Sequence, residues 1–164
     1  MTETLKGKKI LIVDDEPDVL EALGELLDMC EIDCAQNFET AVKMLNENSY
    51  DAAILDIMGV KGYDLLELAT ERDLPALMLT AHALSPEHLV KSLKRGAFSY
   101  IPKIEMFDIA TYLDDAIQKK LVDDRMYQRW FRQLRPVFDK EFGPDWLIKY
   151  KKALKDIDCN RFSK

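Results

Sequence analysis

Short apolar runs alternate with segments of helical periodicity through the first 121 residues of the chain. The runs that favour strands are 9–13, 33–35, 52–55, 76–79 and 98–101, and the segments that favour helices are 19–29, 41–45, 65–71, 89–94 and 109–121. The first, third and fourth runs lack polar alternation, as expected for parallel strands that helices cover on both faces. The second run is short and mixed, so we expect it at an edge. The pattern predicts an α/β fold with a doubly wound, five-stranded parallel sheet and helices on both faces.

Carboxylates stand at the ends of two of these predicted strands. Asp14 and Asp15 follow the run 10–13 directly, and Asp56 follows the run 52–55. Open parallel sheets bind ligands beyond the carboxyl ends of their strands, at the point where the strand order reverses. Carboxylates that converge there repel one another unless a cation lies between them. This rim is therefore a candidate cation site.

Five positions, taken in order along the chain, extend this pattern. They are the acidic pair Asp14 and Asp15, the strand-terminal Asp56, Thr80 followed by Ala81, Tyr100, and Lys103. With these residues in this order, the segment 8–121 resembles the receiver domain of two-component response regulators. The resemblance implies a flavodoxin-like fold with strand order 2-1-3-4-5, and a phosphorylated signalling module in place of a metabolic enzyme.

The resemblance also implies a role for each residue of the rim. Asp56 would be the phosphoacceptor, because its carboxylate can attack a phosphoryl group as a nucleophile. Mg²⁺ would be bound by Asp15, by Asp56 and by the backbone carbonyl of Met58, with Asp14 acting mainly through water and charge. Lys103 would add a second positive charge as the phosphoryl group moves.

Thr80 and Tyr100 are expected to form the switch. The hydroxyl of Thr80 would donate to a phosphoryl oxygen on Asp56, and Tyr100 would then change rotamer. In the family this coupling reaches the surface formed here by 89–94, 98–101 and 109–121, as a two-state packing event. Met58 and His82, two residues beyond Asp56 and Thr80, are expected to tune the lifetime of the phosphate.

Two features depart from the family pattern. The segment 57–62 after Asp56 is short and lacks proline, which leaves the shape of this loop open. Lys103 precedes Ile104, where the family commonly has proline after a cis bond. A cis bond before a residue other than proline costs about 2.5–4 kcal/mol. We expect Lys103 to reach the site whether this bond is cis or trans.

Charge divides the chain unevenly. Residues 1–124 carry 12 Lys and Arg against 25 Asp and Glu, whereas residues 125–164 carry 11 against 5, within a net charge of −7. An acidic body argues against broad nucleic-acid binding by the body, but the basic tail could contact an acidic partner.

Cysteine content and hydropathy predict a cytoplasmic protein. Cys30, Cys34 and Cys159 lack the paired spacing of a metal site and are read as reduced thiols. No run approaches the roughly 20 apolar residues of a membrane span, and residues 1–9 lack the apolar core of a signal peptide. We therefore expect no membrane contact.

The tail is predicted to be a separate amphipathic extension, residues 123–164, after a receiver domain of residues 1–122. It is too short for a winged-helix output domain. One apolar stripe at helical spacing consists of Tyr127, Trp130, Phe131, Leu134 and Phe138. After Gly143-Pro144, a second stripe consists of Leu147, Tyr150, Leu154 and Ile157. These stripes predict two short helices.

Three arginines lie on another face of the first predicted tail helix, and several kinds of surface could contact them. Arg125, Arg129 and Arg132 could face the receiver body, a second copy, another acidic partner or nucleic acid. Packing against the receiver or a second copy is the first expectation, because aromatic anchors with arginines are typical of protein interfaces. Direct DNA binding ranks last, because two helices alone read base sequence poorly.

The leading functional hypothesis is a receiver that accepts a phosphoryl group from a sensor histidine kinase or a phosphotransfer protein. It would then switch contacts with an unidentified downstream protein, and a homodimer is a further expectation. The alternative is a DNA-binding transcriptional regulator that acts through the basic tail. An aspartate-nucleophile phosphatase ranks below both, because Met58 stands where that class has its second aspartate.

Overall fold

The computed structural model describes residues 3–118 and 128–162, with side chains up to residue 157. Five parallel strands form one sheet in the order β2-β1-β3-β4-β5. The strands are β1 (Lys9–Val13), β2 (Glu31–Ala35), β3 (Ala52–Asp56), β4 (Ala76–Thr80) and β5 (Ser99–Pro102). The predicted fold class, strand order and edge position of the second strand are therefore confirmed.

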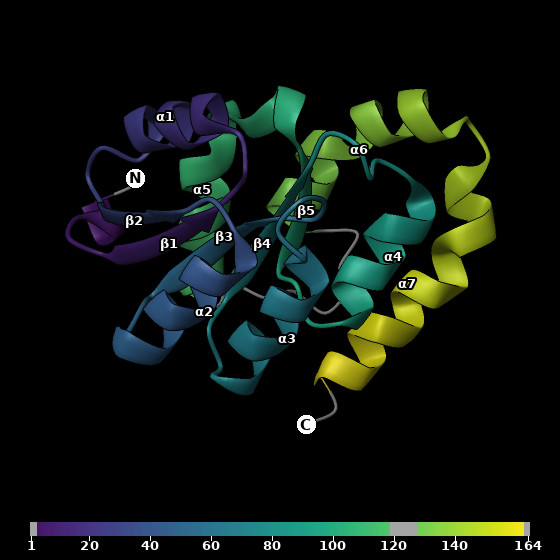
Figure 1. Ribbon diagram of the computed structural model, residues 1–164. Coiled ribbons are helices and arrows are strands. Elements are labelled where there is room, and N and C mark those ends of the chain that lie inside the picture. Colours follow the sequence, from purple (N-terminus) through teal and green to yellow (C-terminus); the bar gives the residue numbers. More distant parts are fainter. Residues whose placement is uncertain (1–2, 119–127, 163–164) are drawn as a thin grey trace.

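Helices cover both faces of this sheet (Figure 1). They are α1 (Pro17–Leu26), α2 (Phe38–Glu47), α3 (Gly62–Glu71), α4 (Pro86–Lys94) and α5 (Ile109–Ile117), with short 3-10 helices η1 (Glu3–Leu5) and η2 (Lys103–Asp108). Helices α1 and α5 lie on one face, and α2, α3 and α4 lie on the other. Residues 119–121, predicted as the end of the last receiver helix, lie outside the described part of the chain.

Helices α2 and α4 begin before the apolar segments 41–45 and 89–94, each directly after a capping residue. Asn37 precedes α2, and its side chain accepts a hydrogen bond from the backbone N–H of Thr40 at 2.8 Å. Ser85 caps α4 in the same way through His88 N–H at 3.1 Å. Such side chains satisfy backbone donors that a helix start leaves unpaired.

The core lies in the centre of the sheet. Every residue of β3 and β4 is buried, and so are four of the five residues of β1, whereas β2 is buried only at Ala35. Cys34 is exposed on this edge strand, and both Cys30 and Cys34 are free thiols. The side chain of Cys159 is outside the described residues.

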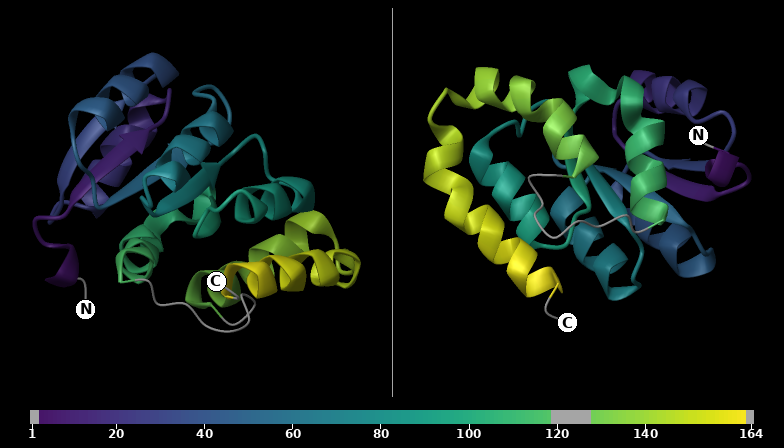
Figure 2. Two further views of the ribbon diagram at one scale, coloured as in Figure 1. Left: turned by 90° about the horizontal axis from the view of Figure 1, so that it is seen from below. Right: turned by 180° about the vertical axis from the view of Figure 1, so that it is seen from behind.

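The tail forms two helices that pack on the receiver body. They are α6 (Arg129–Phe142) and α7 (Trp146–Phe162), separated at Gly143, whose φ of +94° favours glycine. Figure 2 shows α6 beside β5 and α7 running along α4, and contacts between these pairs of elements support that view. The tail therefore covers the β5 edge of the sheet, which would otherwise expose unpaired backbone groups.

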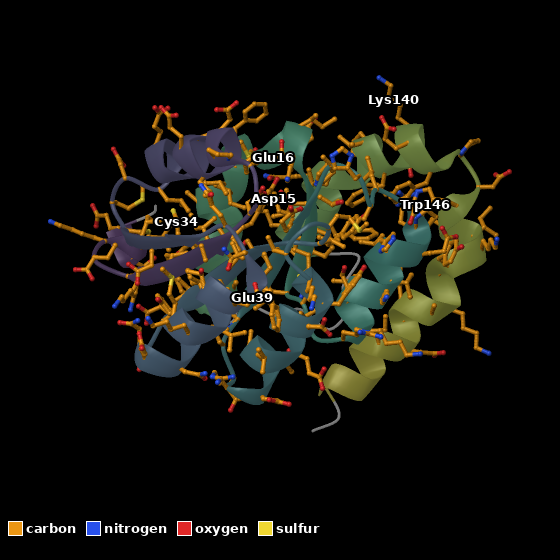
Figure 3. The ribbon with its side chains drawn as sticks, viewed as in Figure 1. Asp15, Glu16, Cys34, Glu39, Lys140 and Trp146 are labelled. Carbon is orange, nitrogen blue, oxygen red and sulfur yellow. The ribbon has the colours of Figure 1, made fainter. Side chains whose placement is uncertain are left out.

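Aromatic side chains fill the space under the tail. The buried residues of α6 are Trp130, Phe131, Leu134 and Phe138, as the first apolar stripe predicts. Trp146 joins them where α6 and α7 meet, with its ring centroid 6.1 Å from that of Phe138 (Figure 3). Tyr127 and Arg125, which belong to the predicted faces of this helix, lie outside the described residues, as does the predicted boundary between residues 122 and 123.

Leu77 offers a test of the core. It is fully buried and is the second residue of β4. Leu77→Ala removes apolar contacts and leaves a cavity, so the free energy of unfolding should fall by about 2–5 kcal/mol in urea titrations. Ile148→Ala is the control, because that side chain is 79% exposed and should change the value by less than about 0.5 kcal/mol. Equal effects of the two changes would contradict the assigned core.

Candidate functional site

The predicted site residues meet at the carboxyl ends of four adjacent strands. Asp14 follows β1, Asp56 ends β3, Thr80 ends β4 and Lys103 follows β5. The parallel register aligns these ends, since Asp56 pairs with Leu79 and Thr80 pairs with Pro102. Asp14, Asp56 and Thr80 are buried, at 1%, 4% and 1% exposure. A polar, largely buried site therefore lies at the rim of an apolar sheet.

Three consecutive carboxylates line one side of this site. Asp14, Asp15 and Glu16 each offer an oxygen within 4.8 Å of the others. Asp14 is buried and accepts a hydrogen bond from the backbone N–H of Glu16 at 2.9 Å, while Asp15 and Glu16 are exposed. Figure 3 shows Asp15 and Glu16 close together next to the start of α1. Such a group of hard oxygen donors suits a divalent cation such as Mg²⁺.

Lys103 joins the acidic group to Asp56. Its ammonium donates a hydrogen bond to Glu16 Oε1 at 2.8 Å and forms ion pairs with Asp14 Oδ2 at 2.9 Å and Asp56 Oδ1 at 3.4 Å. Burial alone would lower the pKa of Lys103, but the hydrogen bonds to Glu16 and Asp14 outweigh it and raise that pKa. Lys103 therefore carries a permanent positive charge within the site.

Burial shifts the acidity of the two buried aspartates. Desolvation and then the negative charge of Asp14 raise the pKa of Asp56 from 3.8 to about 6. Desolvation likewise raises the pKa of Asp14, although its bond to Lys103 opposes the shift. Near neutral pH the site thus holds a buried carboxylate whose charge is poorly solvated, which favours its contact with an incoming cation or electrophile.

Two glycines allow the loop after Asp56, whose shape the sequence did not predict, to lie close to the acidic residues. A Cβ on Gly59, where φ is +89°, would lie 2.4 Å from Asp15 Oδ2, and one on Gly62 would lie 2.1 Å from the carbonyl oxygen of Asp56. The loop can therefore pass close to the acidic residues because these positions have no side chain. Met58, between Asp56 and Gly59, is 50% exposed.

The step after Lys103 is trans, since the described residues contain no cis peptide bond. Lys103 reaches Asp56 with this geometry, and the following Ile104 is 67% exposed. The departure from the family pattern at Ile104 thus leaves the lysine contact in place.

Thr80 and Tyr100 are joined through one backbone residue. Thr80 Oγ1 accepts a hydrogen bond from the N–H of Ala83 at 2.8 Å, and the hydroxyl of Tyr100 donates to the carbonyl oxygen of Ala83. Tyr100 is fully buried, and burial raises the pKa of its hydroxyl. The two expected switch residues therefore share a path, although their switching role stays a prediction.

The expected tuning residues are both exposed, in the loops that follow β3 and β4. His82 is exposed, and its charge contributes to the lowered pKa of Glu16, behind the larger effect of Lys103. Met58, in the loop after β3, is 50% exposed. Both positions are open to an incoming donor or water, while their effect on phosphate lifetime stays a prediction.

Glu16 is the residue that sequence reasoning missed. It makes the shortest contact of Lys103, yet the two residues stand 87 positions apart. The signal that could have indicated it is the third consecutive acid after β1, next to the pair already singled out. On the neighbouring α4 and just after it, Lys91 Nζ and the guanidinium carbon of Arg95 lie 4.2 Å and 5.5 Å from the ring centroid of Tyr63 on α3.

The family model described as "Response regulator receiver domain" matches residues 10–128. The chain belongs to this family. Receivers are signalling modules of two-component systems, generally not classical enzymes, that interact with histidine kinases or phosphotransfer proteins and typically bind Mg²⁺ at an acidic pocket. The site described above has the acidic cluster of such a pocket. No helix among the described residues has the length and apolar character needed to cross a bilayer.

Similar proteins include plant regulators and a bacterial receiver of known structure. The two-component response regulator ARR10 of Arabidopsis thaliana is 36% identical over 104 residues, which cover 59% of this chain and 19% of that protein. ARR11 of the same plant is 28% identical over 155 residues, or 90% of this chain and 28% of that protein. A response regulator receiver domain protein of Clostridium thermocellum superposes with a TM-score of 0.62 at 28% identity, over 69% of this chain and 96% of that one. This receiver thus spans less than a third of either plant regulator.

The raised pKa of Asp56 predicts a pH dependence of stability. Between about pH 4 and pH 6 the folded chain holds a proton on Asp56 that the unfolded chain has lost, so burial of Asp56 makes folding less favourable as pH rises through this window. Asn cannot ionise, so the free energy of unfolding of Asp56→Asn should not fall for this reason. Without divalent cations, its excess over the wild-type value should grow by about 1–3 kcal/mol from about pH 4.5 to about pH 7.5. Urea titrations of the two proteins at the two pH values measure these free energies of unfolding. If the difference between variant and wild type were the same at the two pH values, the raised pKa of Asp56 would be contradicted.

Gly62→Ala tests the close approach of the loop. The added Cβ would meet the backbone of Asp56 and Ile57, which has no rotamer to adjust, so the free energy of unfolding should fall by about 1–3 kcal/mol. Gly24→Ala is the matched control in α1, where no atom lies within 4 Å of the added Cβ. That change should instead stabilise by about 0.5–1 kcal/mol, because alanine is the better helix former. Similar effects of the two variants in urea titrations would refute the packing of this loop.

Proposed function

We propose that this receiver accepts a phosphoryl group on Asp56 from a histidine kinase or a phosphotransfer protein, and that the modification switches its protein contacts. The observation that carries the proposal is the position of Asp56: a buried carboxylate at a strand end, 3.4 Å from Lys103 and beside the acidic cluster. A nucleophile next to a fixed cation and a metal-binding group is what phosphoryl transfer requires.

The transfer would exchange one bond for another. A carboxylate oxygen of Asp56 forms a bond to phosphorus as the bond from phosphorus to the histidine nitrogen of the donor breaks, and the imidazole leaves with that electron pair. Asp56, with a pKa of about 6, is mostly ionised near neutral pH and can act without a separate base. Lys103 Nζ lies 3.4 Å from Asp56 Oδ1, so its charge would stand beside the incoming phosphoryl group and offset the negative charge of its oxygens.

Mg²⁺ fits the donor set of this site. Asp14, Asp15 and Asp56, together with the backbone carbonyl of Met58, would hold the ion, and Glu16 adds a further oxygen to the cluster. When bound, the ion supplies charge neutralisation to the phosphoryl oxygens. The same positive charge would release Lys103 from part of its present pairing with Asp14 and Glu16.

The basic tail gives weaker support to a DNA-binding role. Arg129 is paired with the buried Asp115, its Nε 2.9 Å from Oδ2, and Arg135 is paired with Asp139 at 2.8 Å. The apolar stripe of α6 is turned toward the body. We therefore rank protein contacts above DNA, with a homodimer and a downstream protein as candidate contacts.

Intact mass measurement tests the phosphoacceptor. Incubation of the full chain with a small phosphodonor and Mg²⁺ should add a single phosphoryl group to wild type. Asp56→Asn should abolish the addition because it removes the nucleophile, whereas Asp64→Asn, an exposed aspartate in the first turn of α3, should leave it unchanged. No addition to wild type, or equal addition to Asp56→Asn, would overturn the proposal.

A further inference from the structure

The tail helices are anchored to the receiver by polar contacts as well as by aromatic packing. On α5, the hydroxyl of Tyr112 donates to Gln133 Oε1 at 2.8 Å, and Asp115 pairs with Arg129. On α4, Glu87 accepts a hydrogen bond from the hydroxyl of Tyr150. The chain's own C-terminal segment thus occupies the surface of α4, β5 and α5 that lies behind the site.

Tyr100 lies at the centre of this contact. Its ring centroid is 6.1 Å from that of Phe138 on α6, and both side chains are fully buried. Its hydroxyl points the other way, accepts from Ser85 N–H at 3.1 Å and donates to the carbonyl oxygen of Ala83. One side of Tyr100 is therefore fixed by the segment 83–85 and the other by the tail.

That segment is in turn tied to the site. Ala83 N–H donates to Thr80 Oγ1, so the backbone of Ala83 is held between Thr80 and Tyr100. A hydroxyl can accept one hydrogen bond while it donates its proton to another group, so Thr80 can keep the bond from Ala83 N–H as it turns toward a phosphoryl oxygen on Asp56. The retained bond would draw Ala83 along with Thr80. The movement would shift the acceptor of the Tyr100 hydroxyl, and with it the ring against Phe138.

We propose that docking of α6 and α7 on the receiver is coupled to the phosphoryl state of Asp56, through Thr80, Ala83, Tyr100 and Phe138. The coupling rests on the proposed function of Asp56. The docked tail stabilises the arrangement in which Thr80, Ala83 and Tyr100 are bonded as described, so phosphorylation loosens the tail. Linkage is reciprocal, so the docked tail also opposes phosphorylation. While docked, the tail keeps its apolar stripe from a second copy or a protein partner.

The chain carries its own reporters of docking. Its two tryptophans, Trp130 and Trp146, both belong to the tail helices and are 1% and 4% exposed. Quenching of their fluorescence by a soluble quencher such as acrylamide is therefore weak while the tail is docked. Loosening of the tail admits the quencher and raises the quenching constant.

The experiment measures acrylamide quenching and intact mass on the same samples of the full chain, before and after incubation with a small phosphodonor and Mg²⁺. The quenching constant should rise as the mass increases. An increase in mass with an unchanged or lower quenching constant would overturn the coupling alone. No increase in mass would overturn the proposed function, and the coupling with it.

Two variants test the path itself. Tyr100→Phe keeps the ring beside Phe138 but removes the hydroxyl that binds Ala83, so it should be phosphorylated with a smaller rise in quenching than wild type. Its equilibrium extent of phosphorylation at a fixed donor concentration should also be higher, with an equilibrium constant raised within the range of about 5- to 150-fold that is typical of such couplings. Ile148→Ala, on the exposed side of α7, should match wild type in both readouts. A Tyr100→Phe protein that matches wild type in both would refute the path through Tyr100.

Discussion

The ammonium group of Lys103 is the interaction on which the site depends. Three carboxylates lie within 3.4 Å of it, from the ends of β1 and β3 and from the start of α1. Two of them, Asp14 and Asp56, are buried, and buried carboxylates at this density would repel each other without a cation. The lysine therefore lets the sheet carry an acidic rim in the absence of metal. The same rim could bind a divalent ion, whose positive charge would offset the negative charge that a phosphoryl group adds.

A second constraint follows from the edge strand β5. An open sheet edge needs cover, and here the chain provides it with α6 instead of a partner. The buried aromatic side chains of α6 make that cover apolar, and Tyr100 is common to the cover and to the path from the site. The phosphoacceptor and the tail thus share one packed network, which is the physical basis for a signal that passes from chemistry to surface contacts.

Much of this architecture could be predicted from the sequence, because it depends on local pattern. Uninterrupted apolar runs identify β3 and β4, and parallel pairing then brings Asp56 and Thr80 to the same rim. Helix α2 begins at Phe38, three residues before the predicted segment 41–45, because Asn37 caps it there. The contact between Lys103 and Glu16 could not be predicted, because it joins charged residues from distant segments. For the same reason the sequence predicts the apolar stripe of the tail but not the contact of this stripe with Tyr100.

The central claim is that Asp56 forms an acyl phosphate. Reductive trapping tests it most directly, because borohydride converts an acyl phosphate to a primary alcohol and marks the modified residue for peptide mass mapping. After incubation with phosphodonor and Mg²⁺, we expect the alcohol at position 56 alone, with Asp14 and Asp15 unchanged. Trapping at Asp14 or Asp15, or a phosphorylated chain that yields no alcohol at position 56, would contradict it.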